Sequence, residues 1–257
     1  MTEIIRPLTH LVNLKSPLSI NDYIGEGGYQ GASKALHEYN PKQVLDLVSE
    51  SGLKGRGGAG FPTGMKWGCV PMFPDNGDAD DVPEFKYLVA NADEMEPGTF
   101  KDRYLLEGVP HQLVEAMIIG AYTIAANRGY IFLRGEYHLA AKRLQQAIDE
   151  AYQQNWLGKN IQGSNFSFDL YVHTSAGRYI CGEETALINA LEGRRANPRA
   201  KPPFPQMSGL FGKPTVVNNV ETLSNLPHIL KNGADWFKAL SPNSDPGTKI
   251  YAACGRV

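Results

Sequence analysis

Apolar positions recur at helical spacing in the middle of the chain, and short apolar runs flank this region. Between Pro110 and Ala125 they return every three or four residues, which predicts a core-facing helix that Gly129 ends. Short runs of β-branched and aromatic residues alternate with longer amphipathic stretches. We therefore expect strands over 85–90, 130–133 and 168–173, and helices over 31–39, 41–51, 110–125, 137–154, from 182 onward and over 223–232.

This alternation of strands and helices is typical of an α/β fold, in which a parallel sheet is wrapped by helices. Residues 1–30 contain scattered prolines and predict an extended arm ahead of that sheet. Asn40 is expected to cap a helix that begins at Pro41 and stops before Gly52. An acidic, turn-rich stretch at 71–84 predicts a surface excursion.

Acids and amides gather where the first and third predicted strands end. They are Asn91, Asp93, Glu94, Glu96, Glu183 and Glu184. Ligands of parallel sheets bind at the carboxyl ends of strands, so the loops 91–98 and 174–184 are candidate binding regions. Helix capping by the second pair and a solvated turn at the first group are the alternatives. Acids at two separate strand ends favour a binding function.

A glycine-rich stretch over 52–67 is the most unusual segment of the chain. Its six glycines interleave with Lys54, Arg56 and Lys66, so backbone N–H groups can turn toward an anion that has cations beside it. It is not a P-loop, because no Ser or Thr follows Lys66. Residues 55–60 match Gly-x-Gly-x-x-Gly, but a predicted helix precedes them where a dinucleotide fingerprint requires a strand. The stretch predicts a main-chain site for a phosphorylated cofactor, and a flexible loop or an RNA-contacting Arg-Gly segment stays open.

The proline-rich stretch over 192–205 is a further candidate for binding. Its four prolines can hold Lys201 and Phe204 in place at low entropic cost, which suits a diphosphate and a stacked adenine. The arginines of the same stretch equally suit a basic docking surface for a partner. They are Arg194, Arg195 and Arg199.

The segment 217–222 supplies two amides and a hydroxyl ahead of the last predicted helix. These side chains, Asn218, Asn219 and Thr222, suit the hydroxyls or phosphate of a cofactor. They also suit plain capping of that helix.

Composition narrows the class of protein. The 257 residues are 42% hydrophobic and 20% charged with a net charge of −2, which argues against a disordered or nucleic-acid-coating chain. No apolar run reaches the roughly 18 residues of a membrane span, and Met1 to Arg6 lacks a signal-peptide core, so we expect a cytoplasmic protein. Cys69, Cys181 and Cys254 lie far apart, so no zinc or iron–sulfur motif is spelled and no metal is expected.

Five motifs occur together and in order: GRGGAGFPTGMKW (55–67), NADEMEPGTFKDR (91–103), GRYICGEETALI (177–188), KPPFP (201–205) and VNNVET (217–222). With these motifs the chain closely resembles the flavin-bearing, NADH-oxidising F subunits of bacterial respiratory complex I, from about Ser19 onward. Relatives of that family occur in NAD-linked hydrogenases and formate dehydrogenases. The resemblance implies a Rossmann-like domain with a non-covalent FMN and with NADH stacked on its ring.

The resemblance also assigns residues by position. Those implied to contact FMN are Gly55, Arg56, Gly57, Lys66, Asn91, Asp93, Glu94, Tyr179, Gly182, Glu183, Asn218, Asn219 and Thr222. Those implied to contact NADH are Phe61, Glu96, Glu184, Lys201 and Phe204. No side chain is implied to be an acid or base, since the cofactors carry the hydride, and Glu96 and Glu184 would orient the nucleotide. Cys69 stands where the family has a third aromatic residue for the adenine.

The domain organisation implied by the family has three parts. They are an N-terminal arm with helices (1–51), an FMN- and NADH-binding α/β domain (52–243) and the start of a ubiquitin-like domain (244–257), beginning with a strand near 249–254. Family members continue into a helical bundle that holds a 4Fe–4S cluster, so we expect this chain to be the N-terminal portion. The implied partners are the thioredoxin-like 2Fe–2S protein and the multi-cluster iron–sulfur protein of complex I, its E and G subunits. We expect no nucleic acid and no direct membrane contact, in a peripheral arm on the cytoplasmic side of the inner membrane.

The implied activity is hydride transfer from nicotinamide C4 to flavin N5, then one-electron transfer to iron–sulfur clusters and quinone. Glu184 would accept hydrogen bonds from ribose and repel a 2′-phosphate, which favours NADH over NADPH. The equivalent subunit of a hydrogenase or formate dehydrogenase is one alternative. A non-enzymatic assembly scaffold is another, although such a scaffold has no need of Lys66, Asn91, Glu96 or Glu184. RNA binding through 55–60 is disfavoured by the acidic net charge.

Overall fold

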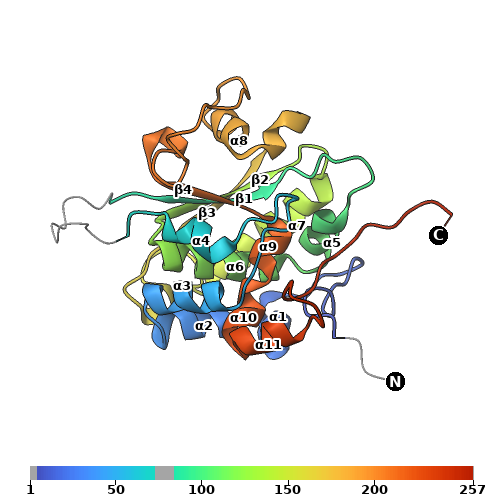
Figure 1. The fold of residues 1–257 in the computed structure, drawn as a ribbon. Coiled ribbons are helices and arrows are strands. Elements are labelled where there is room, and N and C mark those ends of the chain that lie inside the picture. Colours follow the sequence, from blue (N-terminus) through green and yellow to red (C-terminus); the bar gives the residue numbers. More distant parts are fainter. Residues whose placement is uncertain (1–4, 73–83, 257) are drawn as a thin grey trace.

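A parallel β-sheet forms the centre of the molecule. The computed structural model describes residues 5–72 and 84–256. The strands are β1 (Tyr87–Ala92), β2 (Arg128–Leu133), β3 (Asp169–Thr174) and β4 (Thr215–Asn219). They pair in parallel in the order β3-β2-β1-β4, so the predicted parallel α/β fold is confirmed (Figure 1).

Helices cover the two faces of the sheet unequally. Among the α-helices of the described residues, only α8 lies on one face, and the others lie on or beneath the opposite face (Figure 1). The helices are α1 (Ile20–Gly25), α2 (Gln30–His37), α3 (Pro41–Glu50), α4 (Thr63–Gly68), α5 (Lys101–Gly108), α6 (Pro110–Ile124), α7 (His138–Gln153), α8 (Glu184–Leu191), α9 (Val220–Ser224), α10 (Leu226–Asn232) and α11 (Ala234–Ala239), with 3₁₀ turns η2 (Ile161–Gly163), η3 (Tyr179–Gly182) and η4 (Leu210–Gly212).

The fourth strand was not expected from the sequence. Val216 and Val217 are buried in β4, which pairs with β1. The run is short and passes directly into Asn218 and Asn219, so its amides suggest the start of a helix more strongly than the end of a strand. Only pairing with β1 makes these residues a strand.

The central helix α6 is buried along almost its whole length, between the sheet and the N-terminal helices. It ends at Ile124, followed by Ala125 in the left-handed conformation (φ +54°), so the expected end at Gly129 is wrong. Gly129 lies inside β2, where an added Cβ would come within 2.5 Å of the Phe168 ring. This glycine is therefore required by side-chain packing and not by a helix end.

The N-terminal region differs in part from the extended arm expected over 1–30. Residues 20–25 form α1, and Ser19 accepts a hydrogen bond from the Asp22 N–H as its N-cap. The predicted cap of α3 is confirmed, because Asn40 and Gln43 form a reciprocal capping box with Pro41 in the first turn.

The C-terminal third shows two further differences. The single helix expected over 223–232 is two helices, α9 and α10, and Pro227 lies in the first turn of the second. The strand expected over 249–254 does not form, because the Ile250 N–H donates to the Glu221 carboxylate (2.9 Å) and not to a neighbouring strand.

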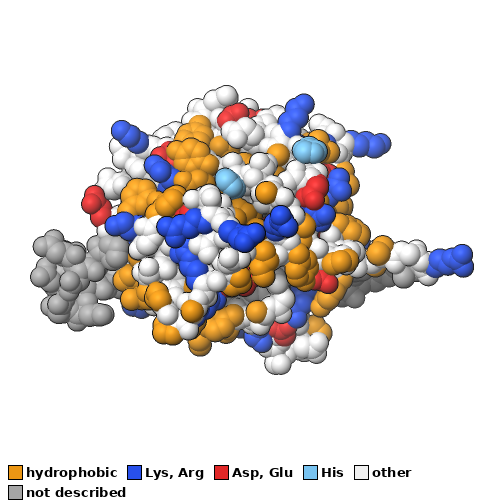
Figure 2. Space-filling model, turned by 90° about the horizontal axis from the view of Figure 1, so that it is seen from above, with side chains coloured by type: hydrophobic (Ala, Val, Ile, Leu, Met, Phe, Trp, Pro, Cys, Tyr) orange, Lys and Arg blue, Asp and Glu red, His pale blue; other side chains and the backbone are white. Residues whose placement is uncertain are grey.

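Three further observations concern the acidic stretch, membrane spans and the molecular surface. The acidic excursion expected over 71–84 lies mostly outside the described residues. Among the residues the structure describes, no helix is long and apolar enough to span a membrane. Figure 2 views the molecule from above, where hydrophobic side chains lie between scattered Lys and Arg; Phe204, Phe211 and Tyr171 are among the exposed large hydrophobic residues of the chain.

Candidate functional site

Two adjoining cavities open at the carboxyl ends of β1 and β4. The first has a volume of about 620 Å³ and the second about 420 Å³. The chain leaves β1 toward β2 on one side, while β4 lies on the other, so the cavities lie where the strand order reverses. Their shared wall is formed by Gly57, Asn91, Gly182, Glu183 and Asn219.

The structure brings together every residue that the sequence singled out for FMN and NADH. Of the FMN set, Arg56, Asp93, Glu94 and Tyr179 line the first cavity alone. Those that line the second alone are Gly55, Lys66, Asn218 and Thr222, and the rest form the shared wall. Of the NADH set, Glu96 lines the first cavity, and Phe61, Glu184, Lys201 and Phe204 line the second. Their roles as ligand contacts stay predictions.

The glycine stretch forms a narrow loop closed by backbone hydrogen bonds. The Gly55 N–H donates to the Phe61 carbonyl (2.9 Å), which ties the two ends of the loop together. Gly58 and Gly60 have φ values of +115° and +66°, in the region that favours glycine. Apart from the glycine and its two chain neighbours, no described residue comes within 4 Å of a Cβ built at either position, so a ligand can approach the main chain there.

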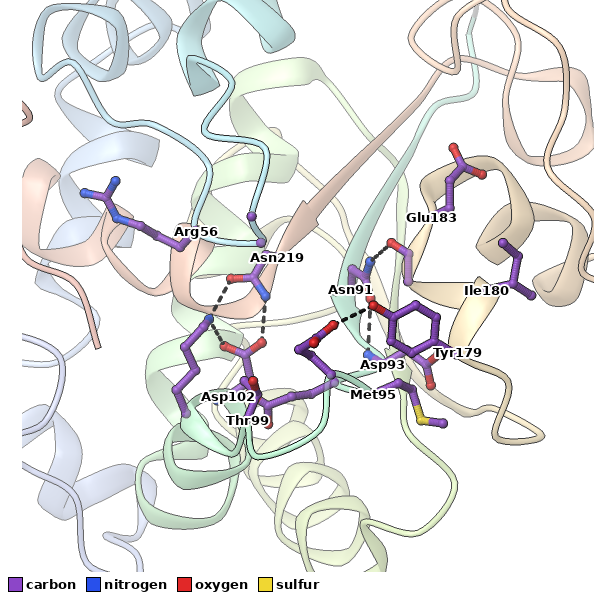
Figure 3. A pocket seen from close by; sticks show the side chains of 16 residues that line it. Arg56, Asn91, Asp93, Met95, Thr99, Asp102, Tyr179, Ile180, Glu183 and Asn219 are labelled. Carbon is purple, nitrogen blue, oxygen red and sulfur yellow. Dashed lines mark hydrogen bonds and ion pairs between the residues drawn. The ribbon is translucent and has the colours of Figure 1, made fainter. Parts of the chain in front are cut away.

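Arg56 does not contribute its charge to this loop as expected. Its guanidinium donates to the Pro246 carbonyl (2.8 Å) and points away from the shared wall (Figure 3). Its backbone N–H donates instead to Thr222 Oγ1 (2.8 Å), which attaches the loop to α9. Lys54 likewise turns to Asp245, so Lys66 is the cation of the stretch that faces the second cavity.

Glu184 lies between two lysines in the second cavity. Its carboxylate accepts from Lys66 Nζ (2.6 Å) and Lys201 Nζ (2.7 Å), and Lys66 also donates to the Val217 carbonyl (2.7 Å). Burial opposes ionisation of Glu184, but the two lysines outweigh it and lower its pKa below the usual range. Lys201 lies 6.0 Å from the centre of the Phe204 ring, so a cation and an exposed aromatic face stand together as predicted.

The acids after β1 are buried, so the alternative of a solvated turn is wrong for Asp93 and Glu94. Burial raises the pKa of both carboxyls. Glu94 caps α5 by accepting from the N–H groups of Asp102 (3.0 Å) and Arg103 (3.1 Å). Asp93 Oδ1 accepts from the Ser175 hydroxyl, while its buried Oδ2 has no hydrogen-bond partner among the described residues. Since Asp93 lines the first cavity, this oxygen is free to accept from a ligand N–H or O–H.

The loop after β3 contributes a helix cap and a contact with the loop after β1. Glu183 caps α8 by accepting from the N–H groups of Thr185 and Ala186 (both 2.9 Å), so capping is confirmed for this residue. The Tyr179 hydroxyl donates to the Glu96 carboxylate (2.5 Å) across the first cavity, which joins the two strand-end loops (Figure 3).

The two amides at the end of β4 also have structural partners. Asn219 caps α9 through its Oδ1, which accepts from the Glu221 N–H (3.0 Å). The alternative of helix capping is therefore confirmed for Asn219. Asn218 Oδ1 accepts from the Trp67 indole (2.8 Å).

Sequence reasoning missed several residues of the site. Thr99, Lys101 and Asp102 line the first cavity, and Gln206 lines the second. The motif over 91–103 contains the first three, but charged residues at the start of a helix normally face solvent, and only the fold buries Asp102 and covers most of Lys101. Cys69 is exposed and lines neither cavity.

A parallel α/β sheet, a bare glycine loop and polar strand ends around adjoining cavities define a protein class that binds a phosphorylated, ring-bearing cofactor. Within this class the chain belongs to the family described as the Nuo51 FMN-binding domain, whose model matches residues 48–228.

Similar proteins agree with this membership. The chain is 56% identical to the F subunit of the NADH-quinone oxidoreductase of Escherichia coli K12, over 100% of this chain and 58% of that protein. It is 51% identical to NADP-reducing hydrogenase subunit HndC of Solidesulfovibrio fructosivorans, over 98% of this chain and 50% of that protein. A crystal structure of an NAD⁺-reducing [NiFe]-hydrogenase in the H₂-reduced state matches with a TM-score of 0.73 and 39% identity, over 86% of this chain and 36% of that chain. This chain thus spans little more than half the length of its curated relatives.

The residues present fit FMN, the cofactor in the family's description. A phosphate needs main-chain N–H groups and a nearby cation, which the glycine loop and Lys66 supply. The free oxygen of buried Asp93 can accept from a flavin N–H or a ribityl hydroxyl. The first cavity, of about 620 Å³, is within the usual size of a cofactor pocket.

Proposed function

We propose that this protein is the flavin-bearing module of an NADH dehydrogenase, with FMN and NADH bound together in the adjoining cavities. One observation carries the proposal: Gly57, Asn91, Gly182, Glu183 and Asn219 line both cavities, so ligands bound in them would share a wall. Hydride transfer requires that its two rings touch, and adjoining cavities permit this contact.

The chain's own residues would bind and orient the ligands. When bound, FMN supplies the acceptor for the hydride of the nicotinamide ring. Lys66 and the N–H groups of the glycine loop would hold anionic groups, and Asp93 would accept from a flavin N–H or hydroxyl. Phe61 and Phe204, both about half exposed at the second cavity, offer faces on which an adenine can stack.

Glu184 would bind the ribose of the nucleotide. Lys201 donates to one of the two carboxylate oxygens of Glu184, and each oxygen can accept a further hydrogen bond, so a ribose hydroxyl can donate to Glu184 beside the lysines. A 2′-phosphate would meet the same carboxylate at close range, and the two negative charges would repel each other. Because of this repulsion we assign a preference for NADH to Glu184. Relatives named for NADH and for NADP both exist, so such a preference is a property that a test can distinguish.

The wider assembly follows the same proposal. We propose the F subunit of respiratory complex I as the particular role, with the thioredoxin-like E subunit and the multi-cluster G subunit as partners in a peripheral arm on the cytoplasmic side. The subunit names of the relatives support partner chains, and their greater length supports an N-terminal portion here, divided at 1–51, 52–243 and 244–257. The equivalent hydrogenase subunit is the second candidate, favoured by the match to the NAD⁺-reducing [NiFe]-hydrogenase.

The purified protein tests the proposal by its absorbance. We expect a flavin spectrum that anaerobic NADH bleaches within the mixing time of a stopped-flow instrument. A flavin spectrum that NADH leaves unchanged would contradict the nucleotide site. A colourless protein that binds no added FMN would favour the scaffold alternative.

A further inference from the structure

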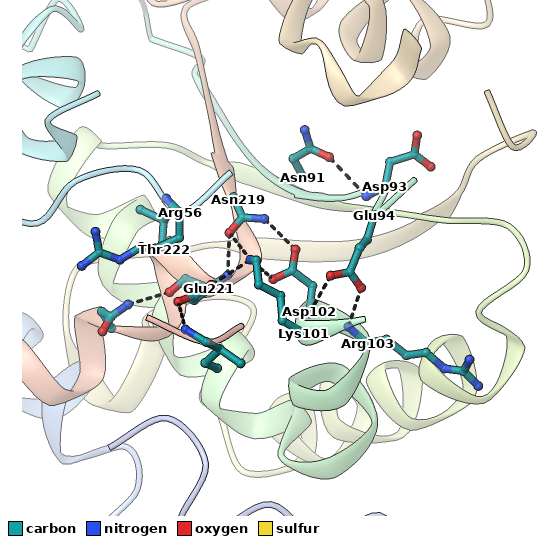
Figure 4. Close-up of polar contacts among 12 residues, drawn as sticks. Arg56, Asn91, Asp93, Glu94, Lys101, Asp102, Arg103, Asn219, Glu221 and Thr222 are labelled. Atoms are coloured by element: carbon teal, nitrogen blue, oxygen red, sulfur yellow. Dashed lines mark hydrogen bonds and ion pairs between the residues drawn. The ribbon is translucent and has the colours of Figure 1, made fainter. Parts of the chain in front are cut away.

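Lys101 lies among buried acids where three segments of the site meet. Its Nζ is 2.8 Å from an oxygen of Asp102 and 2.8 Å from an oxygen of Glu221, and it lies 3.4 Å from Asn219 Oδ1 (Figure 4). Lys101 and Asp102 begin α5, whereas Asn219 ends β4 and Glu221 lies in α9. One ammonium group therefore connects the segment after β1 with the segment after β4.

The burial of this cluster makes the lysine necessary. Asp102 and Glu221 are 3% and 1% exposed, and burying a carboxylate without a partner is costly. Burial opposes the charge on Lys101, but Asp102 and Glu221 outweigh it and raise its pKa, so the lysine is a cation. Removal of this cation would leave buried negative charge beside the first cavity, which Lys101 and Asp102 line.

Asn219 depends on this cluster for its orientation. Its Nδ2 donates to Asp102 Oδ2 (2.6 Å), and its Oδ1 accepts from the Glu221 N–H (3.0 Å). The amide cannot rotate without loss of both bonds, and it keeps one N–H for a ligand. Asn219 also supports the glycine loop, because a Cβ at Gly57 would lie only 3.1 Å from Asn219 Cβ.

We propose that Lys101 is a positioning residue for FMN, which acts by holding Asn219 and, through it, the glycine loop in the wall shared by the two cavities. The inference deepens the proposed function, since FMN is the ligand on which it rests. It gives Lys101 a role in cofactor affinity that requires no contact with the cofactor.

The first test is the dissociation constant of FMN, measured from the quenching of its fluorescence by the apoprotein. We expect Lys101→Met to raise this constant at least tenfold. Lys42→Met is the matched control, because Lys42 is an exposed lysine that also pairs with a carboxylate, Asp46, on α3. It should leave the constant unchanged.

A double-mutant cycle separates positioning from simple charge loss. If Lys101 acts through Asn219, Lys101→Met should weaken FMN binding in the wild-type background but add little in an Asn219→Ala background. A full, additive effect in both backgrounds would overturn the inference, as would an unchanged constant in Lys101→Met.

A charge-balanced variant covers the case in which Lys101→Met does not fold. Lys101→Met combined with Glu221→Gln removes one cation and one anion, so less buried charge is left unpaired. We expect its FMN constant still to rise at least tenfold at an unchanged near-UV circular dichroism spectrum, and wild-type affinity would overturn the inference. Absence of FMN binding by the wild type would instead overturn the proposed function together with this inference.

Discussion

At the residue scale, Glu184 shows how a partly buried acid stays charged between two lysines. Two lysines hold its carboxylate in the second cavity, so the acid and both bases are already desolvated in part. The lysines also make the site sensitive to the charge of residue 184.

The first prediction concerns nucleotide choice. Glu184→Gln removes the negative charge and leaves Lys66 and Lys201 free to accept a 2′-phosphate, so kcat/KM for NADPH should rise about tenfold or more, ~1.4 kcal/mol in transition-state binding. Steady-state assays with both nucleotides and an artificial acceptor would measure it. Glu50→Gln, a change at an exposed acid on α3, should alter neither value. An unchanged ratio between NADPH and NADH in Glu184→Gln would remove Glu184 from this role.

At the scale of elements, the glycine loop is positioned by the packing of α4 on α3. A Cβ at Gly64 would lie 2.2 Å from the Ser49 hydroxyl and 2.7 Å from Ser49 Cα, so only glycine allows this approach. Gly68 lies at the other end of α4, and an added Cβ there would meet no described residue within 4 Å apart from its chain neighbours and the backbone of its own helix. Close packing against α3 therefore requires glycine at position 64 of this short helix but not at position 68.

The second prediction uses this contrast. Gly64→Ala should lower the free energy of unfolding by about 1–3 kcal/mol, because the backbones of α3 and α4 must move apart. Gly68→Ala should be neutral or slightly stabilising, since alanine favours a helix. Urea unfolding of both variants compares them directly. Equal stability of the two would show that the approach of α4 to α3 is not as close as the structure has it.

At the scale of the whole molecule, stability should depend on a histidine that lines neither cavity of the site. The pKa of His228 falls to about 3, because burial and then the charges of His10 and Lys231 disfavour its protonation. Its Nε2 lies 3.0 Å from Gln112 Oε1 on α6, so the neutral ring joins α10 to the central helix. The unfolded chain binds a proton at this histidine near the ordinary value of 6.5, whereas the folded chain binds it only near pH 3.

The third prediction follows from this difference. Between these two pH values the unfolded state binds more protons, so stability falls as the pH is lowered from 6.5. The contribution of His228 at pH 5 is on the order of 2 kcal/mol. His228→Gln keeps a donor for Gln112 and should remove this part of the loss, as measured by urea unfolding from pH 7 to 5. The exposed His138→Gln should retain the wild-type slope, and a His228→Gln slope equal to the wild type would contradict the prediction.

Local sequence could predict much of the fold. Periodic apolar residues placed α6 and α7, and Asn40 with Pro41 placed the start of α3, because these signals act within a few residues. The strand β4 could not be found this way, because Val216 and Val217 become a strand only beside β1. Gly129 was misassigned for the same reason, since its need for a small side chain comes from Phe168, which is distant in sequence.

The sequence by itself determined the parallel α/β class, because the alternation of strand and helix patterns is local. Its five motifs, through the family that they resemble, named residues that line the site. Tertiary structure alone decided how those residues divide between two cavities. It turned Arg56 away to the Pro246 carbonyl and brought Lys101 to the carboxylate of Glu221, which is distant in sequence. The physical reason is that partner choice and desolvation depend on which distant segments meet, and no spacing along the chain encodes that.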